Sequence, residues 1–199
     1  MKITEVAPLD KKRRRVYIDG RYAFPLYLSE LKKYKIEDGR ILPDEVYEEI
    51  CAILTKRVKE RILYLIGDMD RSEYNIRQKL FSCGYQGAFV DNAVSALKEY
   101  GYIDDLRYAR YYAESMRDNK GKSPFAISHA LYEKGIDKDI ISRVMDELEL
   151  DEEEQLMRAL AKKGYTPETL AKEDVSVRMR VCRYLLRKGF SSAIVGTLY

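Results

Sequence analysis

The sequence predicts a mainly α protein made of tandem three-helix repeats, with a small cap at the N-terminus that combines a β-hairpin and short helices. The main observation is a phrase that recurs three times, at Lys79–Tyr85, Ala130–Ile136 and Tyr184–Phe190. The copies align on Gly84, Gly135 and Gly189, which are 51 and 54 residues apart. Such internal similarity is typical of repeat architectures.

Five positions of the phrase and its flanks are apolar in all three copies. They lie four, eight and ten residues before the glycine and five and six after it: Leu80, Leu131, Leu185; Ile76, Ile127, Val181; Tyr74, Phe125, Met179; Phe89, Ile140, Ile194; Val90, Ile141, Val195. Apolar residues one helical turn apart form a buried stripe. We therefore expect these columns to form one continuous core through the stacked copies.

Start and stop signals place the helices around each glycine. Glycine can end a helix in the left-handed conformation. Ser123-Pro124 is a typical helix start, and Asp70 or Ser72 and Asp174 or Ser176 are the equivalent candidates for N-caps in the other copies. A longer helix is expected upstream in each copy, at 57–66, 106–116 and 152–163.

Residues 1–56 follow a different pattern. Strand-like residues flank Asp19-Gly20, which is a two-residue hairpin signal. Ser29 is expected to cap a short helix from Glu30 to Tyr34, and Pro43 to precede another that runs towards the first repeat. The predicted organisation is a cap at 1–56 and repeats at 57–103, 104–150 and 151–199. One repeat buries too little surface to stand alone, so stacking into an elongated, curved rod is expected.

Composition narrows the class of protein. Charged residues make up 35% of the chain, but the formal net charge is only +3. No apolar run reaches the roughly 18 residues of a membrane span, and the N-terminal residues do not resemble a secretory signal. Three widely spaced cysteines predict neither disulfides nor a zinc site. These features favour a cytoplasmic protein.

The sequence offers no catalytic, cofactor or metal constellation. Gly121-Lys122-Ser123 resembles the end of a phosphate-binding loop, but Met116 stands where the first glycine is required. The stretch 68–72 resembles the start of a calcium loop, but Glu73 and Lys79 replace its glycine and glutamate. His129 is the only histidine, which argues against a histidine-dependent triad. We therefore expect a non-enzymatic protein without cofactors.

Basic residues are the candidate contacts with a partner. They are Arg57, Arg61, Arg71, Arg77, Lys79, Arg107, Arg110, Arg117, Lys120, Lys122, Lys134, Arg180, Arg183, Arg187 and Lys188. The last group of arginines has the spacing i, i+3, i+7, which places it on one helix side. One alternative is an ordinary solvated face. The other is a basic edge along the rod that suits phosphates or an acidic protein groove.

The run from Lys11 to Arg15 also has two interpretations. It is either a nucleic-acid contact or a charged residue series that protects the edge of the hairpin.

Several motifs together resemble the RecX family, whose members regulate the RecA recombinase. Tyr100–Ala109 resembles the family's Gly-Tyr-apolar-Asp-Asp-x-x-aromatic-Ala signature. The segment 70–73 with Lys79-Leu80, and the segment from Gly121 through Leu131 to Ile136, resemble two further phrases. The resemblance is firm over residues 57–150 and looser in the third copy.

The resemblance implies a function and a partner. RecX proteins bind the RecA–single-stranded DNA filament along its groove and restrain its ATPase, strand exchange and growth. A role in homologous recombination, DNA repair and the SOS response is thus expected, with RecA as partner, possible contact with single- or double-stranded DNA, no membrane association and a monomeric state. The alternative from the residues alone is an autonomous DNA-binding repeat protein, whose affinity would fall steeply with salt.

Overall fold

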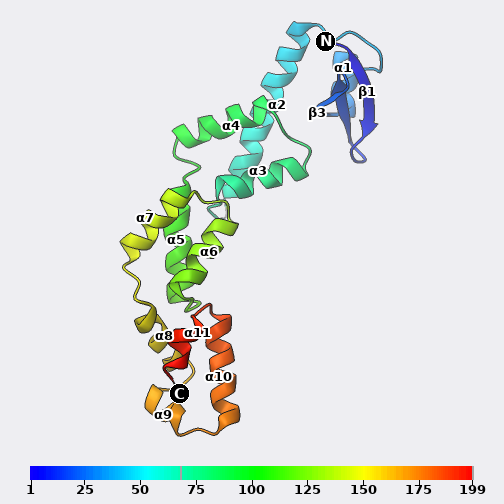
Figure 1. Ribbon diagram of the computed structural model, residues 1–199. Helices are drawn as coiled ribbons and strands as arrows, with labels where there is room; N and C mark the ends of the chain where they lie inside the picture. Colours follow the sequence, from blue (N-terminus) through cyan, green and yellow to red (C-terminus); the bar gives the residue numbers. More distant parts are fainter. Residues whose placement is uncertain (68, 199) are drawn as a thin grey trace. The chain divides into compact units, whose positions relative to one another are not determined.

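The computed structural model describes residues 1–67 and 69–198. They form two compact units, Met1–Asp104 and Asp105–Tyr199. The chain is mainly helical, as predicted, with a small sheet at the N-terminus (Figure 1). The first unit spans the predicted cap and first repeat, and the second unit spans the predicted second and third repeats. The curved rod stays a prediction.

The N-terminal sheet has three antiparallel strands: β1 (Ile3–Pro8), β2 (Arg13–Ile18) and β3 (Arg21–Tyr27), in that order. The predicted hairpin is β2 and β3. Its turn residues, Asp19 and Gly20, have φ values of 48° and 77°, as a type I′ turn requires. Strand β1, which pairs with β2 from Ile3 to Pro8, was not predicted.

Helices α1 (Leu28–Tyr34) and α2 (Asp44–Ile66) follow the sheet. The cap of α1 is Tyr27, not Ser29, and the Glu30 side chain accepts a hydrogen bond from the Tyr27 backbone nitrogen at 2.8 Å. Helix α2 is continuous through residues 56 and 57. The expected helix at 57–66 is thus the second half of a 23-residue helix.

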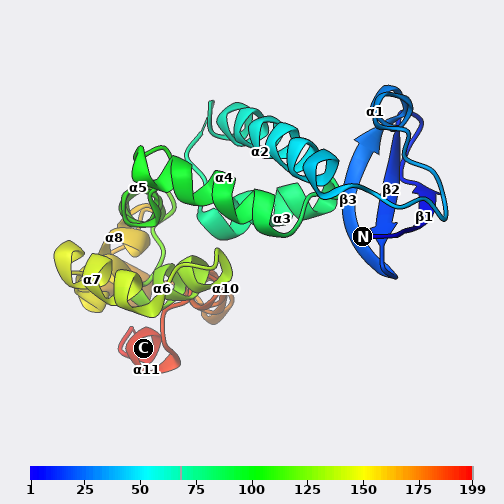
Figure 2. The same cartoon turned by 90° about the horizontal axis from the view of Figure 1, so that it is seen from above.

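Helices α3 (Glu73–Ser82) and α4 (Ala88–Glu99) complete the first unit. Ser72 caps α3 by accepting a hydrogen bond from the Asn75 backbone nitrogen. Helix α4 packs against α2 (Figure 2). One core joins the sheet to all three of these helices, through residues such as Phe24, Leu54, Leu80 and Val94.

The second unit spans the residues predicted to form the second and third repeats. Its first part is α5 (Asp105–Asp118), α6 (Pro124–Glu133) and α7 (Lys138–Leu148), where Ser123 caps α6 as expected. Its second part is α8 (Glu152–Ala161), α9 (Pro167–Ala171), α10 (Val175–Arg187) and α11 (Ser192–Gly196). Asp174 caps α10. The short helix α9 adds a fourth helix to the expected three.

The three repeat glycines end α3, α6 and α10 as predicted. Their φ values are 87°, 73° and 92° for Gly84, Gly135 and Gly189. In each copy the next residue donates its backbone N–H to the carbonyl of the leucine five residues earlier, as in Tyr85 to Leu80 at 2.9 Å. This is the bond pattern of a Schellman-type cap. The following side chain is buried in all three copies.

Two predictions about the core are wrong. The column ten residues before the glycine is exposed, since Tyr74, Phe125 and Met179 have exposed fractions of 46%, 71% and 47%. The buried residues also form three separate clusters, one in the first unit and one in each of the later repeats. The columns four and eight residues before the glycine are buried as predicted.

Candidate functional site

Several predicted contact residues of the first unit hold the fold together. Arg57 forms an ion pair with Glu30 on α1. Arg77 bridges Glu73 and Asp91 at 2.7 Å each, and so ties α3 to α4. Arg71 donates its Nε–H to the Leu65 carbonyl at 2.8 Å, near the end of α2. These side chains are half-buried, so most of their hydrogen-bonding capacity serves local structure.

Predicted contact residues of the second unit also form ion pairs within the fold. Arg110 on α5 donates to both carboxylate oxygens of Glu147 on α7, at 2.7 and 2.8 Å. Arg143 binds the same carboxylate at 2.9 Å. The hydrogen bonds from Arg110 and then Arg143 lower the pKa of Glu147 to about 2. Arg117 pairs with Asp118 at 2.7 Å.

A second group of predicted residues is open to solvent. Arg61, Lys79 and Lys120 are exposed, as are Arg180, Arg183 and Arg187. On α10 the arginines face away from Val181 and Leu185, which are buried. The predicted basic side of this helix is therefore present. Arg107 and Lys134 are half-buried, and the Lys134 ammonium lies 5.9 Å from the centre of the Tyr112 ring.

Lysines gather where the second and third repeats meet, inside the second unit. Lys122 donates to the Arg187 carbonyl at 3.3 Å, and Lys188 donates to the carbonyl of Lys120. Lys162 donates to the Asp118 carbonyl at 2.6 Å. Each accepting carbonyl lies at or just beyond the C-terminal end of a helix, where cations are favoured.

This crowding affects the charge of Lys188. Burial lowers the pKa of Lys188, and the positive charges of Lys162, Lys163 and Lys120 lower it further. Lys162 and Lys163 were not among the predicted contacts, because their proximity to Lys188 depends on the packing of α8 against α10.

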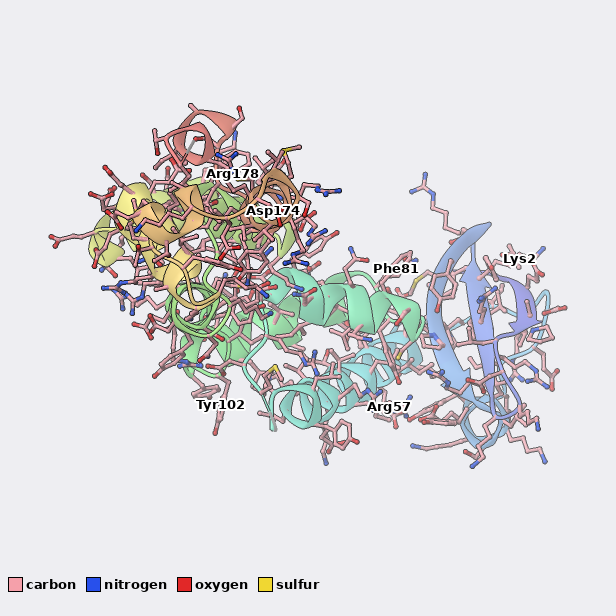
Figure 3. The ribbon with its side chains drawn as sticks, turned by 90° about the horizontal axis from the view of Figure 1, so that it is seen from below. Lys2, Arg57, Phe81, Tyr102, Asp174 and Arg178 are labelled. Carbon is pink, nitrogen blue, oxygen red and sulfur yellow. The ribbon has the colours of Figure 1, made fainter. Side chains whose placement is uncertain are left out.

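An exposed apolar face recurs on the middle helix of every repeat. It consists of the residues ten and three before the glycine, which we call the outer pair: Tyr74 and Phe81, Phe125 and Tyr132, Met179 and Leu186. The second members have exposed fractions of 64%, 60% and 44%. Figure 3 shows Phe81 on α3. Residues seven apart share a helix face, so each pair forms one apolar stripe.

The basic run before the hairpin has a structural role that was not expected. The edge-protection interpretation is wrong for Arg13 to Arg15, because β2 is the middle strand of the sheet. Arg13 donates to Asp10 at 2.8 Å and to the Cys83 carbonyl at 2.9 Å, so it connects the sheet to the end of α3. Tyr22 on β3 donates its hydroxyl to the Gly84 carbonyl beside it.

The described residues contain no group of three or more histidine, cysteine or acidic side chains that could hold a metal ion. Asp68, in the stretch compared with a calcium loop, lies outside the described residues. His129 is on the surface of α6, with Nδ1 3.9 Å from the Glu133 carboxylate. In the described part of the chain, no helix combines the length and apolar composition of a membrane span.

Known proteins resemble the chain over nearly its whole length. The regulatory protein RecX of Clostridium acetobutylicum is 29% identical over 98% of this chain and 92% of its own length. That of Listeria innocua is 26% identical over 98% of this chain and 73% of its own. The family model described as RecX, second three-helix domain, matches residues 104–145. The chain is thus similar to RecX proteins over nearly its whole length, and to one RecX domain model over residues 104–145.

Solved structures are also similar to the chain. A crystal structure of regulatory protein RecX covers 99% of the chain with a TM-score of 0.61 and 26% identity. RecX from Lactobacillus salivarius covers 74% with a TM-score of 0.60 and 21% identity, which supports the fold alone. The RecX relatives are named regulatory proteins, consistent with the expectation that the chain is not an enzyme.

Proposed function

We propose that this chain is a RecX protein and regulates the RecA recombinase by binding the RecA–single-stranded DNA filament and inhibiting its ATPase, strand exchange and extension. The observation that carries the proposal is the similarity to proteins named regulatory protein RecX over 98% of the chain. The protein would act by occupying filament surface, without chemistry of its own, as a cytoplasmic monomer.

The outer pairs support a protein partner made of identical subunits. Three equivalent helices each expose an apolar stripe of two residues, such as Phe125 and Tyr132 on α6. A filament presents the same subunit surface repeatedly, so each stripe can meet an equivalent site. Weak contacts of this kind add up by raising the effective concentration of the remaining ones.

The alternative is an autonomous DNA-binding protein. The exposed arginines of α10, Arg180, Arg183 and Arg187, favour it, because three guanidinium groups on one helix side match a phosphate backbone. The same residues could meet acidic surfaces of RecA protomers, so their position alone does not distinguish the two partners.

The direct test is the ATPase activity of the cognate RecA on single-stranded DNA, titrated with this protein. We expect inhibition that saturates at or below one molecule per RecA protomer. An ATPase rate that stays constant throughout the titration, together with no co-sedimentation with preformed filaments, refutes the proposal.

Two sets of variants separate the partners. Replacing Phe81, Phe125 and Leu186 with serine should weaken inhibition at least about tenfold, which corresponds to about 1.4 kcal/mol, and spare binding to naked DNA. The matched control replaces other exposed apolar residues, Ile41, Tyr111 and Val175, with serine and should keep wild-type inhibition.

The second set reverses charge. If changing Arg180, Arg183 and Arg187 to glutamate abolishes DNA binding and filament binding alike, while the serine variant behaves as wild type, the DNA-binding alternative is favoured. The control reverses Lys56, Lys138 and Lys172, which are equally exposed.

A further inference from the structure

A hollow of about 520 Å³ lies in the first unit, where the start of β2, the middle of α2 and the end of α3 meet. Its volume is within the range of about 300–1,000 Å³ that is usual for small-molecule sites. None of its lining residues belongs to the outer pairs. Arg57 and Arg61 were candidate contacts, and Lys12 and Arg13 belong to the basic run for which a nucleic-acid contact was one of two interpretations. The hollow is therefore a separate feature of the surface.

Positive charge dominates the lining. Lys12, Arg13, Arg57 and Arg61 line it, against only Asp10 and Glu60. The backbone N–H of Lys12 and the side chain of Arg13 bind Asp10 at 2.9 and 2.8 Å and lower the pKa of its carboxyl group. Asp10 is thus occupied by groups of the protein, and the side chains of Lys12 and Arg61 form no ion pair with any described residue.

Arg57, which is labelled in Figure 3, lines the hollow and has one unpaired donor. One of its terminal nitrogens pairs with Glu30, but the other, Nη1, is buried without a hydrogen-bond partner in the described chain. Burial lowers the pKa of Arg57, but Glu30 and then Tyr85 raise it, so the pKa lies above its ordinary value and the guanidinium stays charged. A buried N–H group without an acceptor is costly, so an anion that reaches it would lower that cost.

Three tyrosines complete the lining. Tyr85 is buried at 5% exposure, whereas Tyr27 and Tyr64 are exposed at 36% and 71%. The Arg57 guanidinium lies 4.8 Å from the centre of the Tyr27 ring, and that of Arg61 lies 5.3 Å from the Tyr64 ring. Basic groups interleaved with exposed aromatic rings are the usual means of binding single-stranded nucleic acid.

We infer that this hollow binds a nucleotide unit of a single-stranded nucleic acid, with the phosphate at Arg57, Arg61 and Lys12 and the base against Tyr64. The exposed rim formed by Lys12, Arg61 and Tyr64 leaves room for a chain to enter and leave, which suits a polymer better than an enclosed metabolite. The assignment goes beyond the proposed regulation of RecA and deepens the DNA-binding alternative, because it names a site in the first unit, away from the arginines of α10, that requires no recombinase.

An acidic peptide is the competing ligand class. Its carboxylates could satisfy Arg57, but they would leave the exposed ring of Tyr64 without a planar group to stack on. A base supplies that group, and stacking on an aromatic side chain is largely independent of sequence.

Cys83 provides a local reporter, because it lines the hollow, whereas Cys51 is a half-buried cysteine outside it. The rates of maleimide labelling of both thiols are followed by mass spectrometry in the full-length protein, with increasing oligo(dT). We expect at least about threefold protection of Cys83 and an unchanged rate for Cys51. Equal rates for Cys83 with and without saturating oligo(dT) overturn the inference.

Charge variants test the phosphate contact by fluorescence anisotropy with labelled oligo(dT). The double variant Lys12→Glu and Arg61→Glu should lose the protection of Cys83 and reduce the salt slope of binding by about 0.7 for each lost contact. The control is Lys32→Glu with Lys56→Glu, an equal charge change at exposed positions of α1 and α2 outside the hollow. Equal slopes in the two double variants contradict the assignment.

Competitors identify the ligand class. Thymidine monophosphate should protect Cys83 at higher concentration than oligo(dT), and inorganic phosphate should protect it less than either. If poly-glutamate protects Cys83 as well as oligo(dT) does, or Tyr64→Ala leaves oligo(dT) protection unchanged, the nucleotide assignment is wrong. RecA is absent throughout, so the result is independent of the ATPase titration.

Discussion

Replacing Gly189 with alanine should loosen the contact between the second and third repeats. A Cβ atom at this position would lie 2.5 Å from the Ala126 Cβ and 2.9 Å from the Ser123 Oγ on the facing repeat. The φ value of 92° adds strain for any residue with a side chain. Ser123 also donates its hydroxyl to the Gly189 carbonyl at 2.7 Å, and a shift that relieves the overlap would lengthen this bond.

The magnitude follows from three contributions. The left-handed conformation costs about 1–2 kcal/mol, overpacking about 1–3 kcal/mol and the weakened hydrogen bond about 1 kcal/mol. Because relaxation that relieves the overlap weakens the bond, the effects are not fully additive. We expect a loss of about 3–4 kcal/mol in the free energy of opening at this junction.

Hydrogen exchange of the amides in α6 and α10 measures this free energy in the full-length protein. The matched control is Gly164→Ala, where φ is also positive, at 81°, but no atom lies within 4 Å of the added Cβ. It should cost only the conformational part, about 1–2 kcal/mol. Equal losses in the two variants would refute the steric argument.

Two further outcomes are expected. The Glu147 carboxyl should titrate with a pKa of about 2 in NMR, and the pKa should return towards 4.5 in Arg110→Met. Because the folded-state pKa is lowered, the contribution of this carboxylate to stability is complete above pH 4.5 and is lost as the pH falls through about 2. Equal pKa values in the two proteins would show that Arg110 does not stabilise the carboxylate. Ser72→Ala should lower the free energy of unfolding of the first unit by about 1 kcal/mol in urea, because its fully buried hydroxyl caps α3, whereas Ser95→Ala at an exposed site of α4 should change it little.

Local signals in the sequence predicted much of the helical architecture. The glycine caps, the serine and aspartate N-caps and the buried columns depend on neighbours within about one or two helical turns, so the spacing of Leu80 and Gly84 was sufficient. The column that includes Tyr74 was wrongly predicted to be buried, because its residues are apolar and their angular position around the helix axis was not considered. Residues that are two apart in a helix are separated by about 200° around its axis, so Tyr74 lies on the opposite side of α3 from Ile76.

Features that depend on contacts between residues distant in the sequence could not be predicted. Strand β1 depends on partners in β2 that alternation within Ile3–Pro8 does not reveal. The candidate contacts show the same limit. The sequence does not reveal that α7 places Glu147 beside Arg110, or that Lys162 lies close to Lys188 of the third repeat. The hollow beside Arg57 combines residues from four segments of the chain, and no single spacing in the sequence connects them.

The continuity of α2 has a practical consequence for anyone who shortens this protein. Its first half carries Ile50 and Leu54, and its second half carries Val58 and Ile62, and all four belong to the same core as the sheet. A truncation at residue 57 would cut through a helix, leave the apolar sides of α3 and α4 partly bare and invite aggregation. Expression fragments that respect this helix should start at the first residue or after Asp104.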